Sequence, residues 1–183
     1  AGADTLPGSS TSEVILGLAG NDLLGGAAGA AAPSAADTID GGTGADTVVG
    51  SAGNDRLLGG LGTDALEGGA GADTLIGTAG NFITVAGGAF ELDVASYRTA
   101  TTAVTASLRH SSLNPDGTPR STQTTFNGSF NTGEAAGDRY QGITGLIGSA
   151  QNDTLLGHDN IASLLSGGLG ADSLFGGGGA DTF

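Results

Sequence analysis

The sequence predicts an all-β protein, a β-solenoid in which short parallel strands stack as the rungs of a roll. The main observation is a nine-residue pattern, G-G-x-G-x-D-x-U-x, in which U is a large aliphatic residue. It fills four consecutive segments, residues 41–49, 50–58, 59–67 and 68–76. In each copy the first six residues favour turns, which leaves three residues for a strand only about 10 Å long. Such a strand is not stable alone, so we expect the copies to stack on one another.

The same register extends towards the amino end of the chain. Residues 17–25 form a further copy, and residues 8–16 form a degenerate one with Glu13 in the Asp position. Residues 1–7 read as the back half of an earlier copy, and residues 26–40 as one copy with extra residues in its turn. We therefore expect the chain to be part of a longer array.

The pattern breaks after residue 77 and resumes at Gly148. This divides the chain into a repeat block at 1–85, an irregular β insert at 86–147, and a second, shorter block at 148–183. Phe82 and Ala162 stand where Asp is expected. We expect metal sites to become sparse at these two places.

The aliphatic residue of each copy predicts the core. Because successive side chains of a strand point to opposite faces, the U residue points inward and its two neighbours point outward. Two nonamers then make one coil of 18 residues with two facing strands. The predicted inward ladder consists of Leu6, Ile15, Leu24, Ile39, Val48, Leu57, Leu66 and Leu75.

The Asp residues of alternate copies should form two columns, one on each side of the roll. One column contains Asp4, Asp22, Asp46 and Asp64, and the other contains Glu13, Asp37, Asp55 and Asp73. Rungs lie about 4.8 Å apart, so these carboxylates repel one another unless a cation lies between them. Several Ca²⁺ ions fit best, because Ca²⁺ takes six to eight oxygen ligands in flexible geometry, whereas Mg²⁺ requires a tighter octahedron. The candidate metal ligands are Asp4, Asp22, Asp37, Asp46, Asp55, Asp64, Asp73, Asp153, Asp172 and Asp181.

Composition agrees with a cation as the partner. The formal net charge is −14, and 37 of the 183 residues are Gly. A chain this acidic is a poor ligand for nucleic acid and for anionic membranes. High glycine content with high net charge would by itself predict disorder, but turn preference alone does not produce a fixed carboxylate spacing. No run of about 20 apolar residues is present, so we expect no membrane insertion.

No catalytic motif is recognisable, and we expect the chain not to be an enzyme. The two histidines, His110 and His158, do not lie in an H-E-x-x-H motif, and no G-x-S-x-G motif occurs. A phosphate-binding loop is excluded because the chain has no Lys. His158-Asp159-Asn160 is predicted to be a polar turn in a degenerate repeat.

The nonamers resemble the RTX (repeats-in-toxin) family of haemolysin-type calcium-binding repeats. This resemblance implies a right-handed parallel β-roll, several Ca²⁺ ions, and an insert at 86–147 that continues the solenoid with longer rungs. It also implies export of the unfolded chain through a type I secretion channel and folding outside the bacterial cell. It leaves two roles open. The chain could be a structural segment of a surface, adhesin, S-layer or filament protein, with head-to-tail self-association through open end rungs. Alternatively, it could be the folding and secretion module of a protease, lipase or epimerase.

Overall fold

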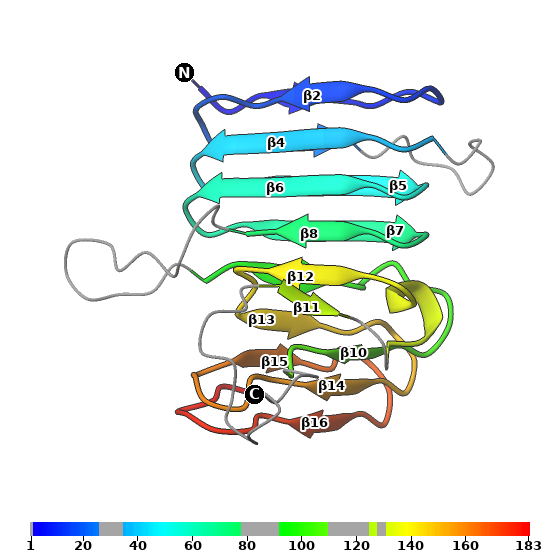
Figure 1. Cartoon of the computed structure of the whole chain (residues 1–183), viewed down its shortest axis with the longest axis vertical. Coiled ribbons are helices and arrows are strands. Elements are labelled where there is room, and N and C mark those ends of the chain that lie inside the picture. Colours follow the sequence, from blue (N-terminus) through cyan, green and yellow to red (C-terminus); the bar gives the residue numbers. More distant parts are fainter. Residues whose placement is uncertain (1, 26–34, 78–91, 110–124, 128–130) are drawn as a thin grey trace, which may run out of the picture.

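The computed structural model describes residues 2–25, 35–77, 92–109, 125–127 and 131–183, with the side chains of 125–127 left out. The described part is a stack of short strands (Figure 1). Its only helical element is a single 3₁₀ turn, η1 (Gly133–Ala135). The chain passes back and forth between two faces, which builds the roll one rung at a time.

One face is a seven-stranded sheet in which every neighbouring pair of strands is parallel. In spatial order its strands are β1 (Thr5–Leu6), β3 (Leu23–Gly25), β5 (Thr47–Ala52), β7 (Ala65–Ala70), β9 (Val94–Ser96), β13 (Gly145–Ile147) and β15 (Leu164–Ser166). We call this face sheet A.

The opposite face consists of a six-stranded and a three-stranded sheet. The first contains β2 (Val14–Leu16), β4 (Thr38–Thr43), β6 (Arg56–Leu61), β8 (Thr74–Ile76), β12 (Arg139–Gln141) and β11 (Thr125–Asn127). The second contains β10 (Thr105–Ser107), β14 (Thr154–Leu156) and β16 (Ser173–Phe175). The pairs are parallel except β11 with β12. We call this face sheet B.

The strand order confirms the predicted parallel β-roll. Up to β9, the odd-numbered strands lie in sheet A and the even-numbered strands lie in sheet B, so two nonamers make one coil. The register also follows the repeat, because each aliphatic U residue pairs with that of the next coil. Val48 of β5, for example, pairs with Leu66 of β7, and Ile39 of β4 pairs with Leu57 of β6.

The strands of the regular coils are longer than the predicted three residues. β4, β5, β6 and β7 each contain six residues, because the first residues of the following turn also pair between rungs. Gly42 pairs with Gly60 in this way, and Thr43 pairs with Leu61. Half of each nominal turn is therefore part of the sheet.

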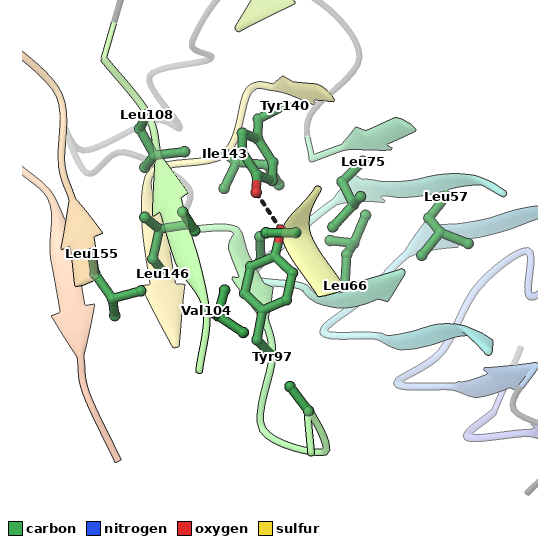
Figure 2. Close-up of a cluster of buried hydrophobic side chains, with 14 of the residues drawn as sticks. Leu57, Leu66, Leu75, Tyr97, Val104, Leu108, Tyr140, Ile143, Leu146 and Leu155 are labelled. Carbon is green, nitrogen blue, oxygen red and sulfur yellow. Dashed lines mark hydrogen bonds between the residues drawn. The ribbon is translucent and has the colours of Figure 1, made fainter. Parts of the chain in front are cut away.

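The predicted aliphatic ladder forms the core of the roll. Its members from Leu24 to Leu75 have no exposed surface, whereas Ile15 is partly buried and Leu6, in the first strand, is exposed. The core continues without a break into the insert, where Tyr97, Tyr140 and Leu146 take over (Figure 2). One apolar cluster therefore spans both repeat blocks.

The insert changes the order of strands in space. In sheet B, β12 lies next to β8, although β10 precedes it in the chain and pairs further along with β14. An antiparallel bridge between Thr105 and Thr132 marks the place where the chain turns back. The chain therefore passes through β10 first and only then returns to place β12 beside β8.

Candidate calcium sites

Carboxylates line up directly before the strands of sheet A, in a column linked by hydrogen bonds. The backbone N–H of Asp4 donates to Oδ1 of Asp22 at 2.8 Å, and that of Asp22 donates to Oδ1 of Asp46 at 2.8 Å. The same bond joins Asp46 to Asp64 at 2.9 Å and Asp64 to Asp93 at 3.0 Å. One carboxylate oxygen of each rung is thus held by the backbone of the rung before it. We call this the A column.

A second column precedes the strands of sheet B. The N–H of Glu13 donates to Oδ1 of Asp37, Asp37 N–H to Asp55, and Asp55 N–H to Asp73, at 2.8–2.9 Å. The N–H of Asp73 then donates to Oδ1 of Asp138 at 2.9 Å. We call this the B column. Both columns follow the order that the spacing of the repeats predicts.

Asp93 and Asp138 extend the columns into the insert, and the sequence analysis missed them. The expectation that metal sites become sparse at Phe82 stays a prediction. Residues 78–91 separate Gly77 from Asp93, and Phe82 lies outside the described residues. A signal was available, because both residues keep the Asp-x-apolar spacing: Asp93 precedes Ala95, and Asp138 precedes Tyr140, both buried.

Beyond the insert the columns are interrupted and then resume. In the B column Val104 takes the Asp position and donates its N–H to Oδ1 of Asp153, whose own N–H donates to Asp172. In the A column the position belongs to Ser163, which donates its N–H to Oδ1 of Asp181. The repeat spacing predicted Ala162 at this position. The copy at 157–166 is one residue longer than a nonamer, and its extra residue lies before Ser163. Neither Val104 nor Ser163 brings a carboxylate.

The second oxygen of several column carboxylates has no hydrogen-bond partner among the described residues, although it is buried. This applies to Oδ2 of Asp22, Asp46, Asp55 and Asp73. These side chains are at most 3% exposed. A buried ionised oxygen without a partner is costly, so each of these atoms requires a proton or a cation.

Glycine at the first repeat position keeps space open beside each of these oxygens. A Cβ added to Gly41 would lie 2.6 Å from Oδ2 of Asp46 and 2.5 Å from the carbonyl oxygen of Gly59. The same arrangement recurs at Gly17 and at Gly148 with their own Asp residues and carbonyls. A carboxylate oxygen and a carbonyl oxygen from the next rung thus face the same space. Any side chain larger than hydrogen would fill it.

This donor set fits calcium. All the donors are oxygens, which Ca²⁺ prefers, and backbone carbonyls are among its usual ligands. Within the described ranges, His, Cys, Asp and Glu side chains form no cluster of three or more that could hold a metal by themselves. Carbonyls of the glycine turns would therefore have to complete each site. The columns and their glycine spaces provide both kinds of oxygen.

Without a cation, some buried column carboxylates have pKa values above their ordinary value. The pKa of Asp73 is raised to about 7, mainly by burial; the Asp55 N–H lowers it, and the neighbouring carboxylates of Asp138 and Asp55 add to the rise. Burial also raises the pKa of Asp46 and Asp55 above their ordinary value. The calcium-free roll is therefore least stable when these carboxylates are ionised.

Acid should partly replace calcium. The pKa of Asp73 is about 7 in the folded chain and about 3.9 in the unfolded chain, so the folded chain binds more protons between these values. Its stabilisation is complete below about pH 4 and is lost as the pH rises towards 7. In EDTA we expect the roll to be more stable at pH 5 than at pH 7.5. Asp73 alone should add roughly 2 kcal/mol to the free energy of unfolding at the lower pH. Far-UV circular dichroism with urea measures this, and stability that rises with pH in EDTA would contradict it.

The remaining polar residues of interest lie outside the columns. His158 is buried, with Nε2 2.8 Å from the carbonyl oxygen of Ile143. Of the predicted polar turn, His158 points inward, whereas Asp159 and Asn160 are exposed. Asp159 is on the surface beside Arg109, and His110 lies outside the described residues. In the part of the chain that is described, no helix has the length and apolar character needed to cross a membrane.

The fold and the columns define a calcium-binding β-roll. Comparison with protein families agrees: the RTX calcium-binding nonapeptide repeat matches residues 7–30, 34–66, 58–81 and 163–183, just over half of the chain. The chain belongs to this family, and Ca²⁺ is the ion that such repeats bind. No curated protein matches the chain.

Proposed function

We propose that the chain is an extracellular structural module that folds when Ca²⁺ binds, after export through a type I secretion channel. The observation that carries this proposal is the set of buried column carboxylates with a partnerless oxygen. These groups oppose folding at neutral pH until a cation arrives. RTX repeats are typical of secreted proteins, and calcium concentrations outside cells reach the range that extracellular sites bind.

The proposed calcium ligands are the column carboxylates. They are the ten predicted residues, Asp4, Asp22, Asp37, Asp46, Asp55, Asp64, Asp73, Asp153, Asp172 and Asp181, joined by Asp93. Asp93 qualifies because its Oδ2 lies beside Gly77, as the Oδ2 atoms of Asp46 and Asp55 lie beside Gly41 and Gly50. Bound calcium supplies the positive charge that the columns lack. The chain itself contributes spacing, open glycine turns and exclusion of water.

Calcium would act on stability by mass action. An ion that binds only the folded chain adds about 1.4 kcal/mol at a concentration ten times its dissociation constant. Several ions along two columns would add several times that amount, because each site lies between rungs that the next ion also stabilises. Folding should therefore switch on over a narrow range of calcium concentration. At cytosolic calcium the same chain would remain unfolded and exportable.

We favour a structural role in a surface, adhesin, S-layer or filament protein, and no catalysis in this chain. The division into blocks 1–85 and 148–183 around the insert 86–147 supports it, because a single core joins all three. Head-to-tail self-association is part of this proposal. Exposed Val14, Leu16 and Leu23 in the first rungs are suited to it, and strictly monomeric particles in electron micrographs with calcium would contradict it. The alternative, a module that follows a secreted enzyme, predicts a catalytic motif in adjoining sequence.

Asp55→Asn tests the proposed ligands. The substitution keeps the acceptor for the Asp37 N–H but removes the charge next to the open space at Gly50. We expect the calcium concentration at half-folding to rise several-fold, measured by circular dichroism during a calcium titration. The matched control is Asp159→Asn, whose side chain is 44% exposed and outside the columns. Equal midpoints for both variants and the wild type would show that Asp55 is not a ligand.

A further inference from the structure

Asp138 differs from Asp55 and Asp73, the two carboxylates before it in the B column. Its Oδ1 accepts the N–H of Asp73, as in every rung, but its Oδ2 accepts a hydrogen bond from the Tyr97 hydroxyl at 2.8 Å. In Asp55 and Asp73 the equivalent oxygen has no hydrogen-bond partner. The protein itself therefore satisfies at Asp138 the atom that faces open space in the regular rungs.

The Tyr97 hydroxyl belongs to a short chain of hydrogen bonds that crosses the interior of the roll. Figure 2 shows Tyr97, which follows β9 of sheet A, meeting Tyr140 of β12 from sheet B with their hydroxyls in contact. Asn131 Nδ2 lies 3.0 Å from the Tyr140 hydroxyl. Both tyrosines are at most 1% exposed and belong to the continuous apolar core.

The protons of this chain can be placed in one consistent order. The Asn131 amide donates to Tyr140, Tyr140 donates to Tyr97, and Tyr97 donates to the Asp138 carboxylate. Asn131 is oriented for this because its Oδ1 accepts the N–H of Ser107 at 3.0 Å. Burial raises the pKa of both tyrosines well above the ordinary value, so both hydroxyls keep their protons. All four groups are satisfied, which is the condition for a stable buried polar network.

The glycine space found in the regular rungs is also absent at Asp138. Gly133 stands five residues before it, as the first-position glycine does in a nonamer, but its added Cβ would meet the carbonyl of Ala103 at 2.5 Å and not Asp138. A hydroxyl therefore stands where the other rungs leave an opening. The two features together, the occupied oxygen and the missing opening, distinguish this rung. Oδ2 of Asp153 also accepts hydrogen bonds, from Ser149, but it keeps the opening at Gly148.

We infer that the Tyr97 hydroxyl takes the place of a calcium ion at Asp138. Asp138 is then a structural member of the B column and not a calcium ligand, and the rung of sheet B that contains it holds together without metal at this position. This inference rests on the proposed calcium binding by the other column carboxylates. It implies that the chain binds fewer ions than its count of stacked carboxylates suggests.

Counting bound ions tests this role of Asp138. Native mass spectrometry of the full chain in calcium would compare the wild type with Asp138→Asn and with Asp55→Asn as the matched control. Both variants keep an oxygen for the N–H of the preceding Asp. We expect Asp55→Asn to lose at least one ion and Asp138→Asn to lose none. Loss of an ion from folded Asp138→Asn would overturn the inference, whereas a wild type without bound calcium would instead refute the proposed function.

A second measurement avoids any change at Asp138. The chain has no Trp and only two Tyr, so Tyr140→Phe leaves Tyr97 as the only tyrosine. The Raman doublet of tyrosine distinguishes a hydroxyl that donates strongly to a carboxylate from one that does not. In saturating calcium we expect the strong-donor signature. A weak-donor signature would mean that an ion holds Asp138, and would overturn the inference even if Asp138→Asn does not fold.

Discussion

Removal of calcium is expected to expand the chain from a roll to an unfolded coil. The regular rungs bury about one aliphatic residue per strand, while they also bury ionised carboxylates with partnerless oxygens. Neighbouring carboxylates at rung spacing repel by roughly 1 kcal/mol per pair in water and roughly 4 kcal/mol at an effective dielectric of 20. Without calcium we expect this electrostatic repulsion to exceed the stabilisation that the thin aliphatic core provides. Small-angle scattering in EDTA should give a radius of gyration of about 45 Å, the value for an unfolded chain of this length.

Addition of calcium should reverse the expansion. With excess Ca²⁺ the radius of gyration should fall to a value far below that of the coil, somewhat above the roughly 16 Å of a compact domain because the roll is elongated. The same concentration of NaCl adjusted for ionic strength is the control, because salt screens charge without occupying a site. A compact chain in EDTA at neutral pH would show that the aliphatic ladder suffices without metal.

The second large effect is expected from Gly41→Ala. The new Cβ would lie 2.5 Å from the carbonyl oxygen of Gly59 and 2.6 Å from Oδ2 of Asp46, closer than real Cβ atoms approach. Gly59 belongs to the next rung, so the backbone of two rungs would have to separate. Overpacking of this kind costs about 3 kcal/mol. Urea unfolding in saturating calcium measures the loss, and the calcium midpoint should rise as well, because the methyl group occupies the space that faces both oxygens.

Gly2→Ala is the matched control for Gly41→Ala. A Cβ at Gly2 meets nothing within 4 Å, so the same chemical change should alter neither the free energy of unfolding nor the calcium midpoint by a measurable amount. Comparison of the two variants separates the filling of the space from the general effect of replacing Gly by Ala. If Gly41→Ala were as stable as Gly2→Ala, the first glycine of the repeat would not be a steric requirement.

The regular block was predictable from sequence because its period fixes three things together. The nine-residue spacing determines which residue points inward, which carboxylates share a side, and which glycines lie beside them. Val48 and Leu66 pair as predicted, and Asp46 and Asp64 stack as predicted. The strands extend further into the turns than predicted, but the inward residues and the stacked carboxylates follow the repeat.

The insert was less predictable because its rungs are not consecutive in sequence. Asp93 and Asp138 enter the columns only because segments of different length return the chain to the same register. β12 pairs with β8 although β10 lies between them in the sequence, an order that no periodicity encodes. Likewise, the bond from Tyr97 to Asp138 joins residues 41 positions apart. Such contacts follow from packing, and the sequence alone offered only the Asp-x-apolar spacing as a hint.

The most direct test of calcium-driven folding is far-UV circular dichroism of the wild type during titration with Ca²⁺, with Mg²⁺ in a parallel titration. The stacked carboxylates and open glycine turns predict a steep transition from coil to β-structure with Ca²⁺ and little change with Mg²⁺, which sheds its water reluctantly and demands a tighter geometry. A β-spectrum already present in EDTA at neutral pH, or an equal response to both ions, would contradict this account of the columns.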